Sequence, residues 1–135
     1  MSEHPFSKVA EAEVELRERR GGGAGSRDIS GALGTEHMVI RRWHYEPGNE
    51  MAYHRHGTQE EVYHLVSGGP QTLQVGNEDH VIQDGDWMAI PKDTPRRIKN
   101  TGGPSEWLTM GAPPGPGITD GIRLDPETGE EIPRT

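Results

Sequence analysis

The chain has 135 residues, the length of a single domain, and it contains no cysteine, so it can form neither a disulfide nor a thiolate metal site. Its formal net charge of −8 argues against nucleic-acid binding, which requires clustered lysine and arginine. No apolar run reaches the length of a signal peptide or a membrane span, so we expect a cytoplasmic protein that binds neither a membrane nor a nucleic acid.

The first 34 residues have the least regular pattern and are predicted to be an extension of strand and loop. Apolar residues alternate at Ala12, Val14 and Leu16, as in a strand, although the same segment could begin a short helix. Gly21 to Gly23 then break the pattern. A second glycine-bearing loop occupies residues 31–34, and we place the start of the main domain after it, at residue 35.

Short strands joined by glycine and proline turns are predicted for the rest of the chain up to residue 111. We expect strands at residues 37–45, 51–56, 61–67, 71–75, 80–83, 87–90, 96–99 and 106–110. Strands at this regular spacing indicate a β-sandwich or barrel, and hence an all-β fold. Residues 112–135 are rich in proline and glycine and are predicted to be a C-terminal tail.

Two histidines and a glutamate form a candidate metal site. His54 and His56 lie two residues apart in a predicted strand, so both imidazoles point to the same face of the sheet. Glu61 follows after the four-residue turn GTQE and is expected to bring its carboxylate to the same face from the next strand. Two imidazoles and one carboxylate suit a divalent ion of iron, manganese, nickel or zinc, with open positions for substrate or water.

The residues around this site have the spacing of a known signature. They read Gly48, NEMAY, His54, Arg55, His56, GTQE, Glu61, VYHLVS and Gly68. This stretch resembles the first signature of the cupin superfamily at every fixed position. The six residues between Glu61 and Gly68 also select Glu61 over Glu60 as the signature glutamate.

A second segment resembles the second cupin signature but departs from it at two positions. It reads Gly85, DWMAI, Pro91, Lys92, Asp93, TP, Arg96, RIK and Asn100. Asp93 stands where the family usually has glycine, and Arg96 stands where the family usually has its last metal-binding histidine. The resemblance therefore implies metal binding for His54, His56 and Glu61 alone.

The resemblance implies a single-domain double-stranded β-helix, or jelly-roll barrel, over residues 35–111. It also implies a metal-dependent protein acting on a small anionic metabolite, with oxidoreductase (dioxygenase-like), isomerase and lyase activities all found in the family. The alternative is a non-catalytic cupin that binds or senses a small molecule. Small cupins commonly pair through an N-terminal strand, so a homodimer is expected, with residues 12–16 as the pairing edge.

Arg96 is the most informative departure from the signature. A guanidinium has no lone pair for a metal and stays protonated at any relevant pH. If it points inward at about 5 Å from a divalent ion, the repulsion is roughly 6 to 7 kcal/mol at an effective dielectric constant of about 20. Three arrangements remain: a three-ligand metal site with an anion near Arg96, an outward-pointing arginine, or a metal-free site in which Arg96 anchors an anion.

Three residues are candidates for a catalytic role beside the metal ligands. Arg96 would orient a carboxylate or enolate oxygen of the substrate. Tyr53 and Tyr63 would assist, although the sequence does not fix the face on which either lies.

Overall fold

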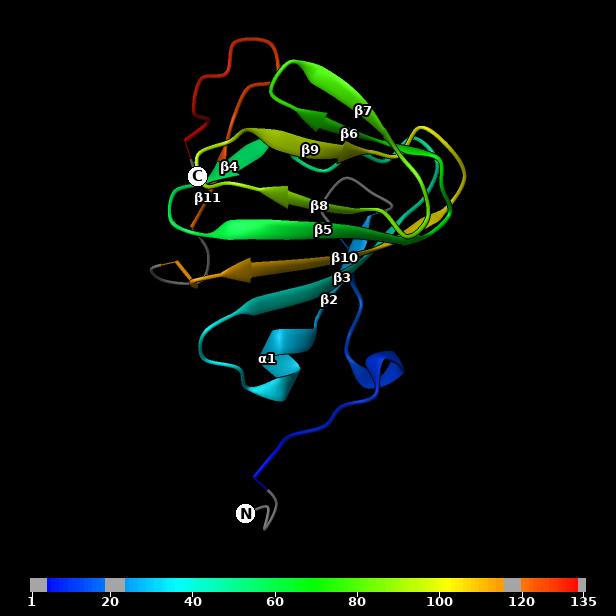
Figure 1. The fold of residues 1–135 in the computed structure, drawn as a ribbon, viewed down its shortest axis with the longest axis vertical. Helices are drawn as coiled ribbons and strands as arrows, with labels where there is room; N and C mark the ends of the chain where they lie inside the picture. The colour runs from blue at the N-terminus through cyan, green and yellow to red at the C-terminus, as the bar shows by residue number, and fades with distance from the viewer. Residues whose placement is uncertain (1–4, 19–23, 116–119, 134–135) are drawn as a thin grey trace.

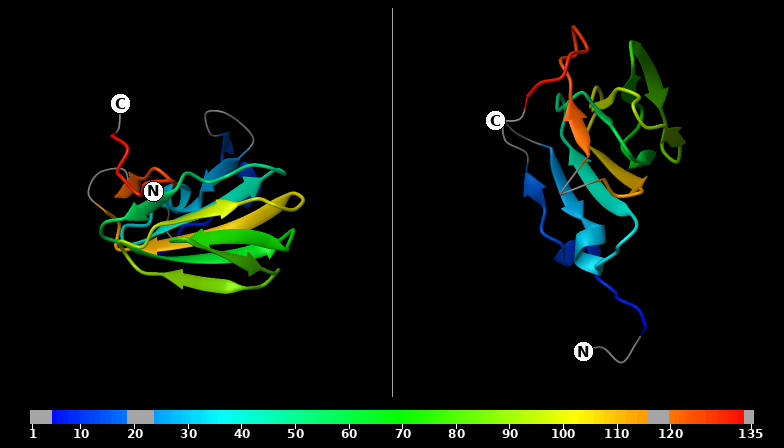
Figure 2. Two further views of the ribbon diagram at one scale, coloured as in Figure 1. Left: turned by 90° about the horizontal axis from the view of Figure 1, so that it is seen from above. Right: turned by 90° about the vertical axis from the view of Figure 1, so that its left-hand side faces the viewer.

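Two antiparallel β-sheets make up most of the structure and face each other (Figures 1 and 2). The computed structural model describes residues 5–18, 24–115 and 120–133, so the predicted break at Gly21 to Gly23 lies outside the described residues. The larger sheet contains, in spatial order, β1 (Arg17–Glu18), β2 (Gly25–Asp28), β3 (Val39–Tyr45), β10 (Ser105–Ala112), β5 (Glu60–Ser67) and β8 (Trp87–Ile90). The smaller sheet contains β11 (Gly121–Arg123), β4 (His54–His56), β9 (Arg96–Lys99), β6 (Gln71–Val75) and β7 (Glu78–Ile82).

The predicted all-β fold is confirmed. Each of the eight strands expected between residues 37 and 110 is present, with ends displaced by at most three residues. Neither helix in the described part of the chain, three and five residues long, has the length or apolar character needed to cross a membrane.

The structure differs from the prediction at the two ends of the chain. Residues 12–16 form no strand; a single 3₁₀ turn, η1 (Glu11–Glu13), precedes the short β1. The helix α1 (Ile29–Leu33) follows β2, because the Asp28 carboxylate accepts a hydrogen bond from the Gly31 amide and Gly34 ends the helix with a φ of 76°. The predicted C-terminal tail contributes β11, which lies beside β4 at the edge of the smaller sheet (Figure 1).

The core lies between the two sheets and draws on both. Its buried cluster consists of Ala24, Trp43, Tyr45, Met51, Tyr63, Leu65, Leu73, Ile82, Ile90, Ile98 and Trp107. Inward positions alternate along each strand, so Leu65 and Ile98 belong to this core, while Glu61 and Arg96 are inward positions farther along the same strands. The interior is therefore apolar along most of its length and polar at one end.

The fixed glycines of the two signatures occupy turns that require a left-handed backbone. Gly48, Gly68 and Gly85 have φ values of 85°, 92° and 88°. At Gly68 a Cβ atom would also lie 2.1 Å from the carbonyl oxygen of Pro104, so the close approach of two chain segments excludes any side chain. Asp93, at the position where the family uses glycine, has a φ of 63° and keeps the same left-handed conformation.

Candidate metal centre

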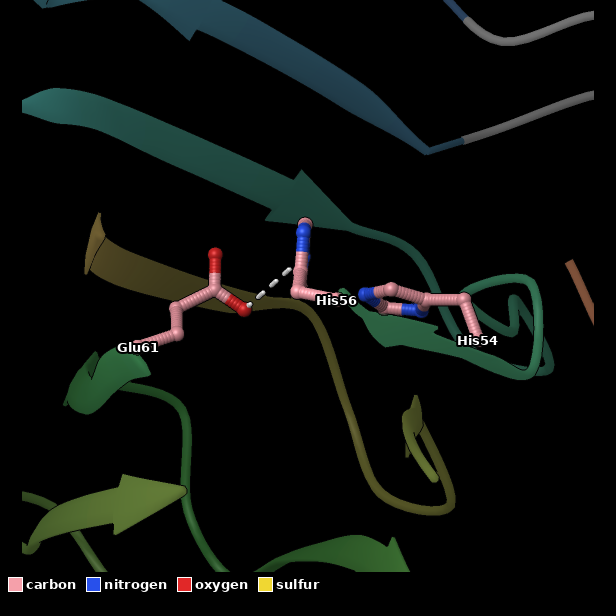
Figure 3. A group of neighbouring side chains, drawn as sticks. All are labelled: His54, His56 and Glu61. Atoms are coloured by element: carbon pink, nitrogen blue, oxygen red, sulfur yellow. Dashed lines mark ion pairs between the residues drawn. The ribbon is translucent and has the colours of Figure 1, made fainter. Parts of the chain in front are cut away.

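The three predicted ligand residues converge between the sheets (Figure 3). His54 and His56 extend from β4 of the smaller sheet, and Glu61 extends from β5 of the larger sheet. One nitrogen or oxygen of each residue lies within 4.8 Å of the others. Ligand atoms bound to one ion at about 2.1 Å are at most about 4.2 Å apart, so the three side chains need only small adjustments to share an ion.

Hydrogen bonds select the ring nitrogen that each histidine offers to the interior. His54 Nδ1 lies 2.7 Å from the carbonyl oxygen of Ala52, and His56 Nδ1 lies 2.7 Å from Oδ1 of Asp120. Both partners only accept hydrogen bonds, so each Nδ1 is the donor. In a neutral imidazole the lone pair is then on Nε2, which is the atom available to a metal.

The protonation states also suit metal binding. Burial, aided by the charge of Arg96, lowers the pKa of His54 to about 4, so this imidazole is neutral at neutral pH. Burial raises the pKa of Glu61, but His56 and Arg96 outweigh it and bring the pKa to about 2. The site therefore offers a neutral imidazole and an ionised carboxylate without any proton having to leave first.

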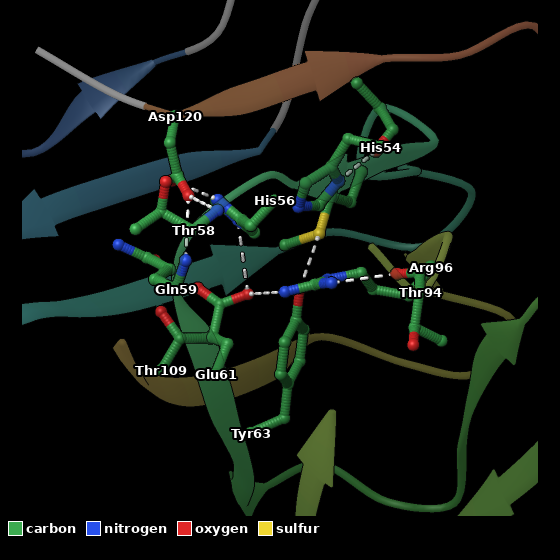
Figure 4. Close-up of polar contacts among 12 residues, drawn as sticks. His54, His56, Thr58, Gln59, Glu61, Tyr63, Thr94, Arg96, Thr109 and Asp120 are labelled. Atoms are coloured by element: carbon green, nitrogen blue, oxygen red, sulfur yellow. Dashed lines mark hydrogen bonds and ion pairs between the residues drawn. The ribbon is translucent and has the colours of Figure 1, made fainter. Parts of the chain in front are cut away.

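Arg96 is wholly buried and points into the site, so the outward arrangement is wrong. Its Nη2 donates to Oε1 of Glu61 at 3.0 Å, and its Nη1 donates to the carbonyl of Thr94 at 2.8 Å (Figure 4). Its Nε is buried without a hydrogen-bond partner among the described residues. The arginine pairs directly opposite His54 across β4 and β9, and its charge lies beside the ligand carboxylate.

The two tyrosine candidates have different surroundings. Tyr63 is fully buried beside the Glu61 and Arg96 pair, and its hydroxyl donates to the sulfur of Met51 at 3.6 Å. Burial, followed by the charge of Glu61, raises its pKa well above the ordinary value. The Tyr53 hydroxyl instead donates to the carbonyl of Gly76, and the Tyr53 ring lies against Arg97. The structure therefore brings Tyr63 to the site and does not bring Tyr53.

His44, His64 and His80 have partners outside this site. His44 contacts Glu46 and Glu106, and His64 stacks on Trp87 with 3.7 Å between ring centres. His80 lies 3.6 Å from Glu78. A cavity of about 460 Å³ lies between β6, β7 and β8, and none of the candidate metal or catalytic residues lines it.

Asp120 is a site residue that the sequence did not reveal. It belongs to the predicted tail and reaches His56 across 64 residues of sequence. Its Oδ2 accepts the amides of Thr58 and Gln59 at 2.8 and 2.9 Å (Figure 4). Burial raises the pKa of this carboxyl, but hydrogen bonds from Gln59, His56 and Thr58 together hold it below its usual value.

Comparison with known proteins gives one family match. Residues 41–111 match the model of the cupin domain family. An uncharacterised protein of Methanocaldococcus jannaschii is 38% identical over 69 residues, or 50% of this chain. The match covers 54% of that curated relative, about half its length.

Two of the solved structures with a similar fold are described as sugar phosphate isomerases. A protein of Acidithiobacillus ferrooxidans, provisionally identified as a sugar phosphate isomerase, is 30% identical with a TM-score of 0.61, covering 66% of this chain and 58% of that one. A sugar phosphate isomerase of the cupin superfamily from Silicibacter pomeroyi is 20% identical with a TM-score of 0.73, covering 93% of this chain and 91% of that one.

Proposed function

The chain belongs to the cupin domain family, and from this premise we propose that it is a metal-dependent enzyme acting on a small anionic metabolite. His54, His56 and Glu61 would hold a divalent ion of iron, manganese, nickel or zinc. The observation that carries the proposal is the convergence of two imidazoles and one ionised carboxylate, with one ligand atom of each within 4.8 Å of the others. When bound, the ion supplies Lewis acidity or a centre for dioxygen activation.

The charges around the site support an anionic substrate. Glu61 and Asp120 carry one negative charge each, Arg96 carries one positive charge, and His54 is neutral. A bound divalent ion would therefore change the summed charge of these four side chains from negative to positive. Arg96 would favour an anionic substrate through its charge, and its guanidinium carbon lies 6.0 Å from the centre of the buried Tyr63 ring.

The alternative is a binding or sensing cupin in which Arg96 contacts an anion directly. The buried Nε of Arg96, which lacks a partner among the described residues, favours this alternative. However, the exposed fraction of Arg96 is 0%, so a ligand would have to displace its neighbours to reach it. Recognition through the metal requires no such displacement, and we prefer it for this reason.

We also propose a homodimer. β1 ends the larger sheet, so one edge of Arg17–Glu18 has no neighbouring strand within the described chain. Such an edge can pair with a second copy. Deletion of residues 1–20 should then change the mass measured by light scattering from that of a dimer to that of a monomer. A mass per particle that stays the same would exclude pairing through this segment.

The metal proposal is tested by elemental analysis of protein purified without added metal. We expect a transition metal in stoichiometric amount in the wild type and in His80→Ala, which removes a histidine outside the site. We expect little or none in His54→Ala. Equal, near-zero occupancy in all three proteins would refute metal binding. Turnover of small carboxylates that stops on chelation and returns with Fe(II) would then distinguish the enzyme from the binding protein.

A further inference from the structure

Asp120 joins the two chain segments on which the metal centre depends. One of its oxygens accepts from His56 Nδ1, and the other accepts from the amides of Thr58 and Gln59 in the turn between β4 and β5. This turn separates two ligand residues, His56 and Glu61. The Asp120 side chain is only 4% exposed, so these contacts are shielded from water.

The strand that follows Asp120 supports the same region. β11 pairs with all three residues of β4, with Gly121 opposite His56 and Arg123 opposite His54. On its other side β4 pairs with β9 at one position, His54 opposite Arg96. The histidine strand is therefore held mainly by a segment that lies beyond the matched residues 41–111.

We propose that Asp120 is a positioning residue of the metal centre, which holds the proton of His56 on Nδ1 and directs Nε2, 3.5 Å from Oε1 of Glu61, towards a divalent ion. The inference rests on the proposed metal binding, but the tautomer itself can be measured without a metal. A carboxylate that orients a metal-binding imidazole in this way typically changes metal affinity 10- to 100-fold.

The two oxygens of Asp120 make Asp120→Asn an informative variant. Both oxygens accept hydrogen bonds, whereas an asparagine has one accepting oxygen and one donating NH₂ group. If the NH₂ group faces His56, the imidazole must accept at Nδ1 and carry its proton on Nε2, the atom needed by the metal. If the NH₂ group faces the turn, a donor points at the donating amides of Thr58 and Gln59, and those two hydrogen bonds are lost.

The first measurement records the His56 tautomer by long-range ¹⁵N–¹H correlation in metal-free protein at about pH 8.5, roughly two units above the ordinary imidazole pKa. We expect Nδ1–H in the wild type and in Asp120→Glu, which keeps two accepting oxygens, and Nε2–H in Asp120→Asn. Asp125→Asn is the matched control, because Asp125 also accepts two backbone amides in the same segment, those of Glu127 and Thr128. This control should keep the wild-type tautomer.

The second measurement is Zn(II) affinity by calorimetry. We expect a loss of 10- to 100-fold in Asp120→Asn and no loss in Asp125→Asn. Unchanged Nδ1–H in folded Asp120→Asn, or wild-type affinity in that variant, overturns the proposal. If Asp120→Asn does not fold, Asp120→Glu decides, and an Nε2–H tautomer there overturns it. A wild type that has the expected tautomer but binds no Zn(II) refutes the metal proposal and leaves the role of Asp120 in setting the tautomer intact.

Discussion

The guanidinium of Arg96 donates to the carboxylate of Glu61, with 3.0 Å between Nη2 and Oε1. The residue that replaces the last histidine of the family signature thus binds the glutamate of that signature. This contact pairs a largely buried carboxylate with a permanent positive charge, in addition to the His56 imidazole 3.5 Å away. A metal at the site must therefore share Glu61 with a permanent cation, and metal affinity should be lower than in a site with a fourth imidazole.

Arg96→His should increase affinity for Zn(II) at least about ten-fold, because it removes a repelling charge and adds a nitrogen ligand. Calorimetric titration measures the change. Arg97→His is the matched control, since the neighbouring arginine points the other way and contacts Gln74 and Glu50. An Arg96→His affinity at or below that of the wild type would contradict the assignment of Arg96 to the vacated ligand position.

Gly68→Ala should lower the free energy of unfolding by more than about 3 kcal/mol, whereas Gly48→Ala should lower it by about 1 kcal/mol. Both glycines have left-handed φ values, but a Cβ at Gly68 meets the Pro104 carbonyl at 2.1 Å, while a Cβ at Gly48 meets nothing within 4 Å. Denaturant unfolding of the two variants measures the difference. Equal losses would show that the close approach at Gly68 relaxes without cost.

Asp93→Ala should be less stable than Asp93→Gly by about 1 kcal/mol. Both variants lose the 2.9 Å contact between Asp93 and Arg55, so their difference isolates the cost of a side chain at a φ of 63°. Chemical denaturation under identical conditions provides the comparison. If the alanine variant were as stable as the glycine variant, backbone strain would not explain the family's preference for glycine here.

Stability should depend on the protonation of His44. Its two ring nitrogens lie 2.7 Å from Glu46 and 2.8 Å from Glu106, and these hydrogen bonds raise its pKa above 6.5. A raised folded-state pKa gives stability that is full below the unfolded-state value and is lost as pH rises through the folded-state value. The difference in unfolding free energy between the wild type and His44→Gln should therefore be larger at about pH 5.5 than at about pH 9.

The control for this prediction is His37→Gln. His37 is 90% exposed and lies 3.8 Å from an exposed Glu36, a contact that contributes little in water. His37→Gln should therefore change the free energy of unfolding little at either pH value. A pH-independent effect of His44→Gln would show that the imidazole contributes by packing and not through its charge.

Short-range sequence patterns predicted the features that depend on residues close together in the chain, namely the strands, the turns and the spacing of the candidate ligands. Strand alternation placed His54 and His56 on one face, and the fixed spacing to Gly68 selected Glu61 over Glu60, which is exposed in the structure. Glycine and proline turns located the strands between residues 37 and 110, because each turn has its own backbone requirement.

Contacts between distant segments could not be predicted in this way. Asp120 meets His56 across 64 residues, and no periodic pattern within a tail rich in proline and glycine marks it. β11 is only three residues long and forms because β4 offers it a free edge. The inward burial of Arg96 also depends on a partner on the opposite sheet, Glu61, and the residue type alone left both directions open.

The pairing of β11 with β4 determines how much of the chain would have to be moved to transfer the candidate metal site to another barrel. A graft that ends at residue 111, where the family match stops, would carry every signature residue yet omit the strand beside the two histidines and the carboxylate hydrogen-bonded to one of them. The smallest transferable unit extends through Arg123.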